Sequence, residues 1–346
     1  MRVSRAMWVA LVCMLLLALV GGAVHWSLPK HNVQSNDIYF SYVEGGRLLA
    51  GENPYGRVAA GNMRDDQKYA TYVPGFYLLS AITRKLGLED YLQWITFWRW
   101  VWLGFNLGSA CVIFYALFER KGVLLGLFGA LFWLLNRWTL HLTQSANLEY
   151  FAIFFLLLSL FLFERHKTAA FVLLGISLSV KQVAILAVPL YLIWAWQSAP
   201  AGARVTSRLG MSAKAAALIA SVPVVLSLPF IFWNAEGFGK SMIFEAVRNA
   251  AGHVNAPSLD SLLGQSGIVA RMPLFGMLVL VYAMAWLRKV RMYTSMLLAM
   301  AVFVDFGSVL FLQYFCWLVP FIPLAVCDLM DGGGRREKRL AEAAIG

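Results

Sequence analysis

Apolar stretches long enough to enter or cross a lipid bilayer recur along this sequence and alternate with short basic segments. Hydrophobic residues make up 60% of the 346 positions and charged residues only 14%, whereas soluble domains have roughly 45–50% and about 25%. The composition excludes a water-soluble globular protein. It predicts an all-α polytopic membrane protein with one transmembrane domain over residues 1–331 and a short basic cytoplasmic tail over 332–346.

Ten membrane spans fit the apolar pattern, with both termini in the cytoplasm. They are predicted at 6–28, 94–118, 122–138, 147–163, 168–181, 183–197, 215–232, 267–287, 293–311 and 314–330. The segments then assigned to the cytoplasm carry most of the Lys and Arg between spans, as the positive-inside rule expects. The net charge of +11 therefore reflects topology, and no nucleic-acid partner is expected.

The first extracytoplasmic loop is predicted to hold two interfacial helices. Residues 37–51 form an amphipathic pattern that begins at Asp37 and ends at Gly51. The stretch 69–86 is apolar enough to cross the membrane, but a crossing there would invert the charge bias of every later loop. We therefore interpret it as a helix on the outer leaflet.

Asp37 begins the first of these helices and is open to two interpretations. A carboxylate at this position commonly caps backbone N–H groups. It can also act as a general base at the membrane surface. Glu44, Asp65 and Asp66 are weaker acidic candidates, and no further acid or histidine stands at metal-ligand spacing from the Asp65-Asp66 pair. The residues thus imply no cofactor and leave metal dependence open.

Lys181 lies between two short apolar stretches, where a charge is costly unless it has a partner. It is expected either to bind a phosphate or to pair with Glu149. Arg99 and Arg271 lie near the outer ends of predicted spans and are candidate partners of one another and of Asp305, which is expected to be paired inside the bundle. His253 is a catalytic candidate in the second outer loop, close to Asn255.

Several short motifs resemble those of the GT-C superfamily of integral-membrane glycosyltransferases, especially the bacterial polyprenol-phosphate-mannose-type mannosyltransferases. The first outer loop carries Asp37-x-Tyr39, Gly51-Glu-Asn-Pro-Tyr55 and Tyr72-Val-Pro-Gly75. Later landmarks are Gln144-Ser-Ala-Asn147, Ser179-Val-Lys-Gln182 and Asn255-Ala-Pro-Ser-Leu259. The chain carries the single acid Asp37 where many members have an acidic pair.

The resemblance implies a sugar transfer, of mannose or a similar sugar, from a polyprenyl-phosphate donor to a lipid-linked or cell-envelope acceptor. It implies an active site on the extracytoplasmic side of a bacterial inner or plasma membrane, with membrane lipids in contact. Asp37 would be the catalytic base, and Lys181 with an outer-end arginine, for which Arg99 and Arg271 are the candidates, would stabilise the lipid phosphate. The residues assigned to substrate binding are Tyr39, Glu44, Tyr72, Asn147, Gln182 and Asn255.

Two other functions fit the same sequence. A transporter or flippase of lipid-linked sugar would use a charged residue between broken helices, as at Lys181. A non-catalytic assembly subunit would tolerate the loss of both Asp37 and Lys181.

Overall fold

The computed structural model describes residues 5–31, 37–58, 61, 69–247, 258–265 and 267–331. These residues form helices joined by short connections, and no strand occurs among them. The predicted all-α class is therefore confirmed.

The helices of the first half begin with a long N-terminal helix and two short helices that follow it. Their bounds are α1 Arg5–Ser27, α2 Asp37–Leu49, η1 Gly56–Val58, α3 Gly75–Lys85, α4 Tyr91–Lys121, α5 Val123–Leu135, α6 Arg137–Ser145, α7 Glu149–Leu162 and α8 Lys167–Val180.

The second half also contains both long and short helices. Their bounds are η2 Gln182–Ala187, α9 Val188–Gln197, α10 Val205–Trp233, α11 Ala235–Val247, α12 Leu259–Leu262, η3 Val269–Arg271, α13 Met272–Trp286, α14 Met292–Phe306 and η4 Leu312–Trp317. A final apolar helical segment spans Leu312–Asp331 and includes η4.

Among the described residues, five helical segments are long and apolar enough to cross a membrane. They are Met7–Ser27, Tyr91–Lys121, Val205–Trp233, Val269–Trp286 and Leu312–Asp331. A sixth span results if α5 and α6 are counted as one. Four shorter apolar helices, at Glu149–Leu162, Lys167–Val180, Gln182–Gln197 and Met292–Phe306, lie in four other predicted stretches. A helix of 14 residues reaches about 21 Å, short of the roughly 30 Å hydrocarbon core.

The predicted span 122–138 is interrupted in the structure. Helices α5 and α6 meet at an angle of 46°. The side chain of Asn136 causes the break, because it accepts hydrogen bonds from the N–H groups of Trp138 and Thr139 and so caps a new helix. The apolar pattern alone did not reveal this cap.

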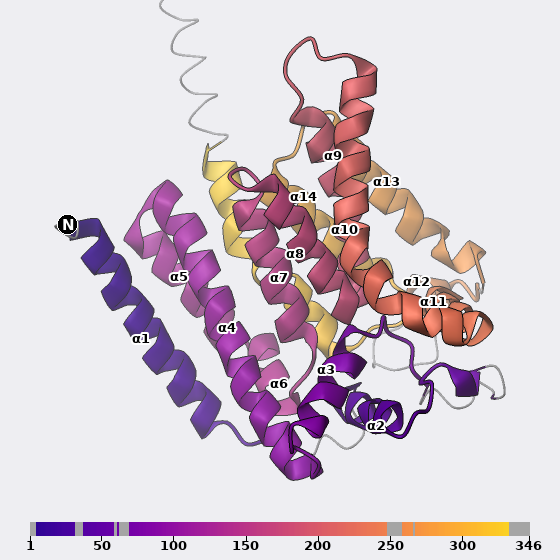
Figure 1. The fold of residues 1–346 in the computed structure, drawn as a ribbon. Coiled ribbons are helices and arrows are strands. Elements are labelled where there is room, and N and C mark those ends of the chain that lie inside the picture. Colours follow the sequence, from indigo (N-terminus) through magenta and orange to yellow (C-terminus); the bar gives the residue numbers. More distant parts are fainter. Residues whose placement is uncertain are drawn as a thin grey trace, which may run out of the picture.

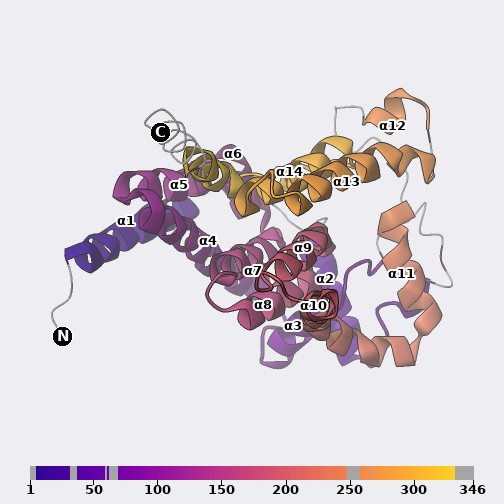
Figure 2. The same ribbon diagram turned by 90° about the horizontal axis from the view of Figure 1, so that it is seen from above.

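The long helices run side by side, and α2, α3 and α11 gather at one end of the bundle (Figure 1), called here the α2–α3 end. The N-terminus and the connection between α9 and α10 lie at the opposite end. In the perpendicular view, α1 and α5 occupy one edge and α11 and α12 the other, with α7 and α8 between them (Figure 2).

Large apolar side chains remain exposed along several long helices. Leu19 is 70% exposed on α1, Leu124 is 81% exposed on α5, and Phe232 is 84% exposed on α10. Water would disfavour such a surface, whereas lipid chains would cover it. These exposed faces, together with the long apolar helices, indicate a membrane protein.

Helices occur in both parts of the first loop where the sequence predicts them. Gly51, two residues after the end of α2, has a φ of +77°, as its predicted role at the helix terminus requires. Helices α2 and α3 approach closely at Gly45, where an added Cβ would lie 2.4 Å from Ser80 Oγ. Gly75 likewise allows the start of α3 to reach the end of α8.

Candidate functional site

A cluster of two acids, a lysine and a tyrosine joins four distant parts of the sequence at the α2–α3 end. Lys181 Nζ lies 2.8 Å from Asp37 Oδ2, 3.0 Å from the Tyr72 hydroxyl and 3.1 Å from Glu149 Oε1. The Tyr72 hydroxyl also donates a hydrogen bond of 2.7 Å to Asp37 Oδ2. The structure thus brings together the predicted residues Asp37, Tyr72 and Lys181.

Lys181 reaches this cluster because the chain is broken between α8 and η2. Its backbone is extended, with φ −140° and ψ 119°, and its N–H still donates to Ser177 O. The next residue, Gln182, donates from Nε2 to Thr71 O at 3.1 Å. Because of this break, Lys181 contacts Asp37, and the side-chain amide of Gln182 contacts the backbone next to Tyr72.

Tyr72 is held in place through its backbone as well as its hydroxyl. Tyr55 donates from its hydroxyl to Tyr72 O at 2.6 Å, and the Tyr72 N–H donates to the Tyr77 hydroxyl at 3.3 Å. Tyr55 is itself positioned by a turn in which its N–H donates to Asn53 Oδ1. The turn at Asn53 therefore connects the Asn-Pro-Tyr motif, which contains Tyr55, to the Tyr-Val-Pro-Gly motif, which begins at Tyr72.

Glu149 is the buried member of the cluster. It is the first residue of α7, which starts after a sharp turn at Ala146 with φ +52°. Its side chain is fully buried, and its Oε2 has no hydrogen-bond partner among the described residues. The ammonium of Lys181 supplies the positive charge that such a buried carboxylate requires.

The cluster combines one cation with two carboxylates, of which only Asp37 faces outward. The side chain of Asp37 is 29% exposed, whereas those of Lys181 and Glu149 are 2% and 0% exposed. A lysine has three N–H donors, and here three oxygen groups lie within 3.1 Å of them. The pairing of Lys181 with Glu149 is therefore present, and it extends to Asp37.

Glu44 occupies a separate ionic contact on α2. Its Oε1 accepts hydrogen bonds from Arg47 at 2.6 Å and from Arg57 at 2.7 Å, and the residue is buried. Burial raises the pKa of the Glu44 carboxyl, although the two arginines act in the opposite direction. This contact ties α2 to η1, and the predicted substrate role of Glu44 stays a prediction.

The remaining predicted residues lie around the cluster or apart from it. Tyr39 packs edge-on against Tyr91 with ring centres 5.1 Å apart, and the buried Asn147 donates to Ser145 Oγ. Arg99 donates to three backbone carbonyls, those of Thr143, Gln144 and His31. Arg271 ends η3 at the start of α13.

Four acidic or polar candidates of the two outer loops lie outside the described residues: His253, Asn255, Asp65 and Asp66. Asp305 was expected to be paired inside the bundle, and this expectation is wrong. Its side chain is exposed near the end of α14, and the described residues offer it no ion-pair partner.

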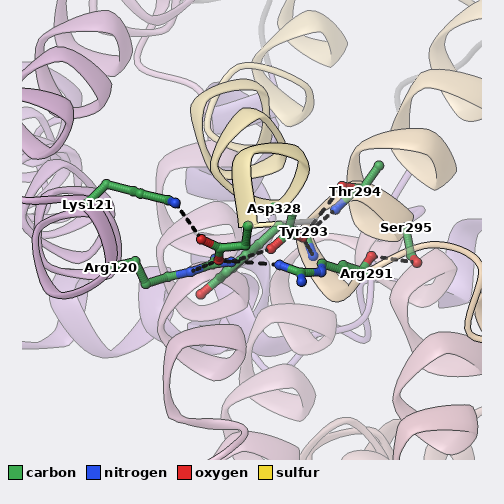
Figure 3. Close-up of polar contacts among 8 residues, drawn as sticks. Arg120, Lys121, Arg291, Tyr293, Thr294, Ser295 and Asp328 are labelled. Carbon is green, nitrogen blue, oxygen red and sulfur yellow. Dashed lines mark hydrogen bonds and ion pairs between the residues drawn. The ribbon is translucent and has the colours of Figure 1, made fainter. Parts of the chain in front are cut away.

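An ionic network at the opposite end was not predicted. Arg120 Nη2 donates to Asp328 Oδ1 at 2.7 Å (Figure 3). Arg120 also contacts Asp331, which Lys121 Nζ approaches to 2.7 Å. Asp328 Oδ2 accepts from the N–H groups of Tyr293 and Thr294, so it caps α14 from another helix. The one sequence feature that pointed to this network is the pair of acids, Asp328 and Asp331, at the end of the last apolar stretch.

This network lines a cavity of about 860 Å³ whose walls come from several connections between helices. The basic side chains around it come from three sequence regions and are Arg120, Arg165, Lys167, Arg288 and Arg291. Three of the basic segments that the sequence assigned to the cytoplasm thus meet around this cavity.

The sequence matches no protein-family model, and no curated protein is significantly similar to it.

Proposed function

We propose that the protein is an integral-membrane glycosyltransferase that moves a sugar from a polyprenyl phosphate to a lipid-linked or cell-envelope acceptor. The observation that carries the proposal is the cluster at the α2–α3 end. There a partly exposed carboxylate at the head of an amphipathic helix is fixed by a buried lysine and a tyrosine. The motif resemblance implies the same acid as the catalytic base.

In the proposed reaction, Asp37 accepts the proton of the acceptor hydroxyl. The acceptor oxygen forms a bond to the anomeric carbon of the donor sugar, and the bond between that carbon and the phosphate oxygen breaks. Polyprenyl phosphate leaves with the electron pair. Lys181 and Tyr72 hold the carboxylate in position, and the ammonium provides positive charge near the departing phosphate.

We further propose that the chain crosses the membrane ten times, with α2 and α3 on the extracytoplasmic leaflet of a bacterial inner or plasma membrane. The basic side chains around the opposite cavity support this orientation, because positive residues favour the cytoplasmic side. The four short apolar helices would then cross within the bundle, where neighbouring protein surrounds their ends.

The test incubates the purified protein with radiolabelled polyprenyl-phosphate sugars and a membrane-lipid extract, and it measures the labelled product. The Asp37→Asn variant keeps a side chain of the same shape but cannot take up the proton, so turnover should fall by ~10²–10⁴. Asp305→Asn is the matched control, because it also removes an exposed carboxylate but does not change the cluster around Lys181. Wild-type turnover in Asp37→Asn would refute the proposal that Asp37 is the base.

A transporter or flippase of lipid-linked sugar is the second candidate. The break between α8 and η2, with Lys181 between two carboxylates, is an arrangement that transporters use for buried charges. Proteoliposomes that move a fluorescent lipid-linked sugar across the bilayer, with no covalent product, would favour this candidate over the enzyme.

A further inference from the structure

A second cavity lies between the end of α1 and the first part of α4. Its volume is about 670 Å³, and its described lining residues are His25, Trp26, Lys30, His31, Tyr91, Leu92, Ile95, Thr96, Arg99 and Trp100. None of these residues belongs to the cluster around Lys181, and none carries a carboxylate.

The two cations of this cavity have no acidic partner within the part of the chain that the structure describes. Arg99 donates to the carbonyls of Thr143, Gln144 and His31, and Lys30 donates to the carbonyl of His25. Carbonyl oxygens satisfy these donors but leave both positive charges uncompensated. Burial and the charge of Arg99 lower the pKa of the Lys30 ammonium, as expected where two cations are close.

Aromatic side chains place the cavity at the level of lipid headgroups. Trp26 is 78% exposed and Trp100 is 53% exposed; both line the cavity, and their ring centres lie 6.4 Å apart. The apolar span Met7–Ser27 ends at this position. Tryptophan at the end of an apolar span is typical of the membrane interface, where the phosphates of lipids also lie.

We propose that this cavity binds the phosphate group of an anionic membrane lipid. Lys30 and Arg99 contact the phosphate oxygens, and the acyl chain leaves past Trp26 and Trp100 into the bilayer. A phosphate fits because it accepts several charged hydrogen bonds at once and neutralises a site that has two cations. The cavity shares no residue with the cluster of Asp37, Tyr72, Glu149 and Lys181. Its Arg99 is one of the two arginines that the motif resemblance offers for the donor phosphate, and the site proposed here is for a membrane lipid.

The experiment titrates the delipidated protein in detergent with phosphatidylglycerol, phosphatidylcholine or inorganic phosphate, and it measures bound lipid by native mass spectrometry and phosphate by calorimetry. We expect tight binding of phosphatidylglycerol, which Lys30→Gln weakens by roughly ten-fold, the loss expected for one charged hydrogen bond. Lys85→Gln is the control, because Lys85 is an exposed lysine on α3 and does not line the cavity.

The variant Arg99→Gln also removes hydrogen bonds to the backbone, so its thermal midpoint is measured to check its folding. For this reason Lys30→Gln is the variant that decides the test. Equal binding of phosphatidylglycerol by the wild type and Lys30→Gln would overturn the site. Equal affinities for phosphatidylglycerol and phosphatidylcholine would show that the negative charge of the lipid is not recognised, and would overturn the proposal. Binding of inorganic phosphate without phosphatidylglycerol would assign the cavity to a free anion and overturn the lipid.

Discussion

Single side chains decide the properties of the cluster around Lys181, and the first prediction concerns its charge balance. Lys181→Met should lower stability by about 3–5 kcal/mol, because it leaves the fully buried Glu149 without a counter-charge. Adding Glu149→Gln to Lys181→Met should recover part of this loss. The thermal midpoint of the detergent-purified protein measures both changes.

Lys240→Met is the control, since the described residues give Lys240 one ion pair, with the exposed Glu236, and its midpoint should match the wild type. A double variant as unstable as Lys181→Met alone would contradict the predicted coupling between Lys181 and Glu149.

Glu44 gives a prediction on pH. Burial raises the pKa of this carboxyl above its ordinary value of 4.5, so the folded protein holds the proton more tightly than the unfolded chain. The resulting stabilisation is complete below pH 4.5 and is lost as the pH rises through the raised pKa. Relative to Glu44→Gln, the wild type should therefore lose stability over this interval.

Thermal midpoints measured from acid to neutral pH test this difference, with Glu52→Gln as the control because the Glu52 side chain is 63% exposed. Parallel curves for the wild type and Glu44→Gln would show that protonation of Glu44 does not contribute to the pH dependence of stability.

Pairs of helices depend on close backbone approaches, of which the contact between α3 and α8 bears most directly on the site. A Cβ at Gly75 would lie 2.4 Å from Ser179 O, a backbone atom that cannot rotate away. Gly75→Ala should cost about 1–3 kcal/mol in stability. It should also reduce turnover, since Tyr72 and Lys181 stand three and two residues from this contact.

Gly104→Ala is the matched control in a helix interior, because its Cβ would meet no heavy atom within 4 Å. Alanine there should leave stability unchanged or raise it by up to about 1 kcal/mol. If Gly75→Ala behaves like Gly104→Ala, the close approach of α3 to α8 does not hold the site together.

The molecule as a whole has two chemically different ends, and this asymmetry gives the topology prediction. In a variant without the four native cysteines, Lys85→Cys on α3 should react with a membrane-impermeant maleimide added to intact cells. His166→Cys, exposed at the end that carries the ionic network, should react only after the cells are permeabilised. The reverse labelling pattern would contradict the proposed orientation of the bundle.

Local chemistry in the sequence determined the all-α class, the positions of the apolar helices and the two helices of the first loop. Apolar runs without polar interruption require helices in lipid, because only a helix satisfies its backbone hydrogen bonds within one segment. The cost of an isolated charge likewise marked Lys181 as a residue that needs a partner. These properties depend on neighbours in the sequence, so they can be inferred from it.

Tertiary structure alone decided which partners meet and where helices stop. Lys181 is 144 residues from Asp37, and Arg120 is 208 residues from Asp328, so no periodicity relates them. Asn136 divides a continuous apolar run because its side chain caps the next helix, and Asp305 is exposed despite its place in an apolar stretch. Contacts between distant segments depend on how the helices pack, which the local pattern does not specify.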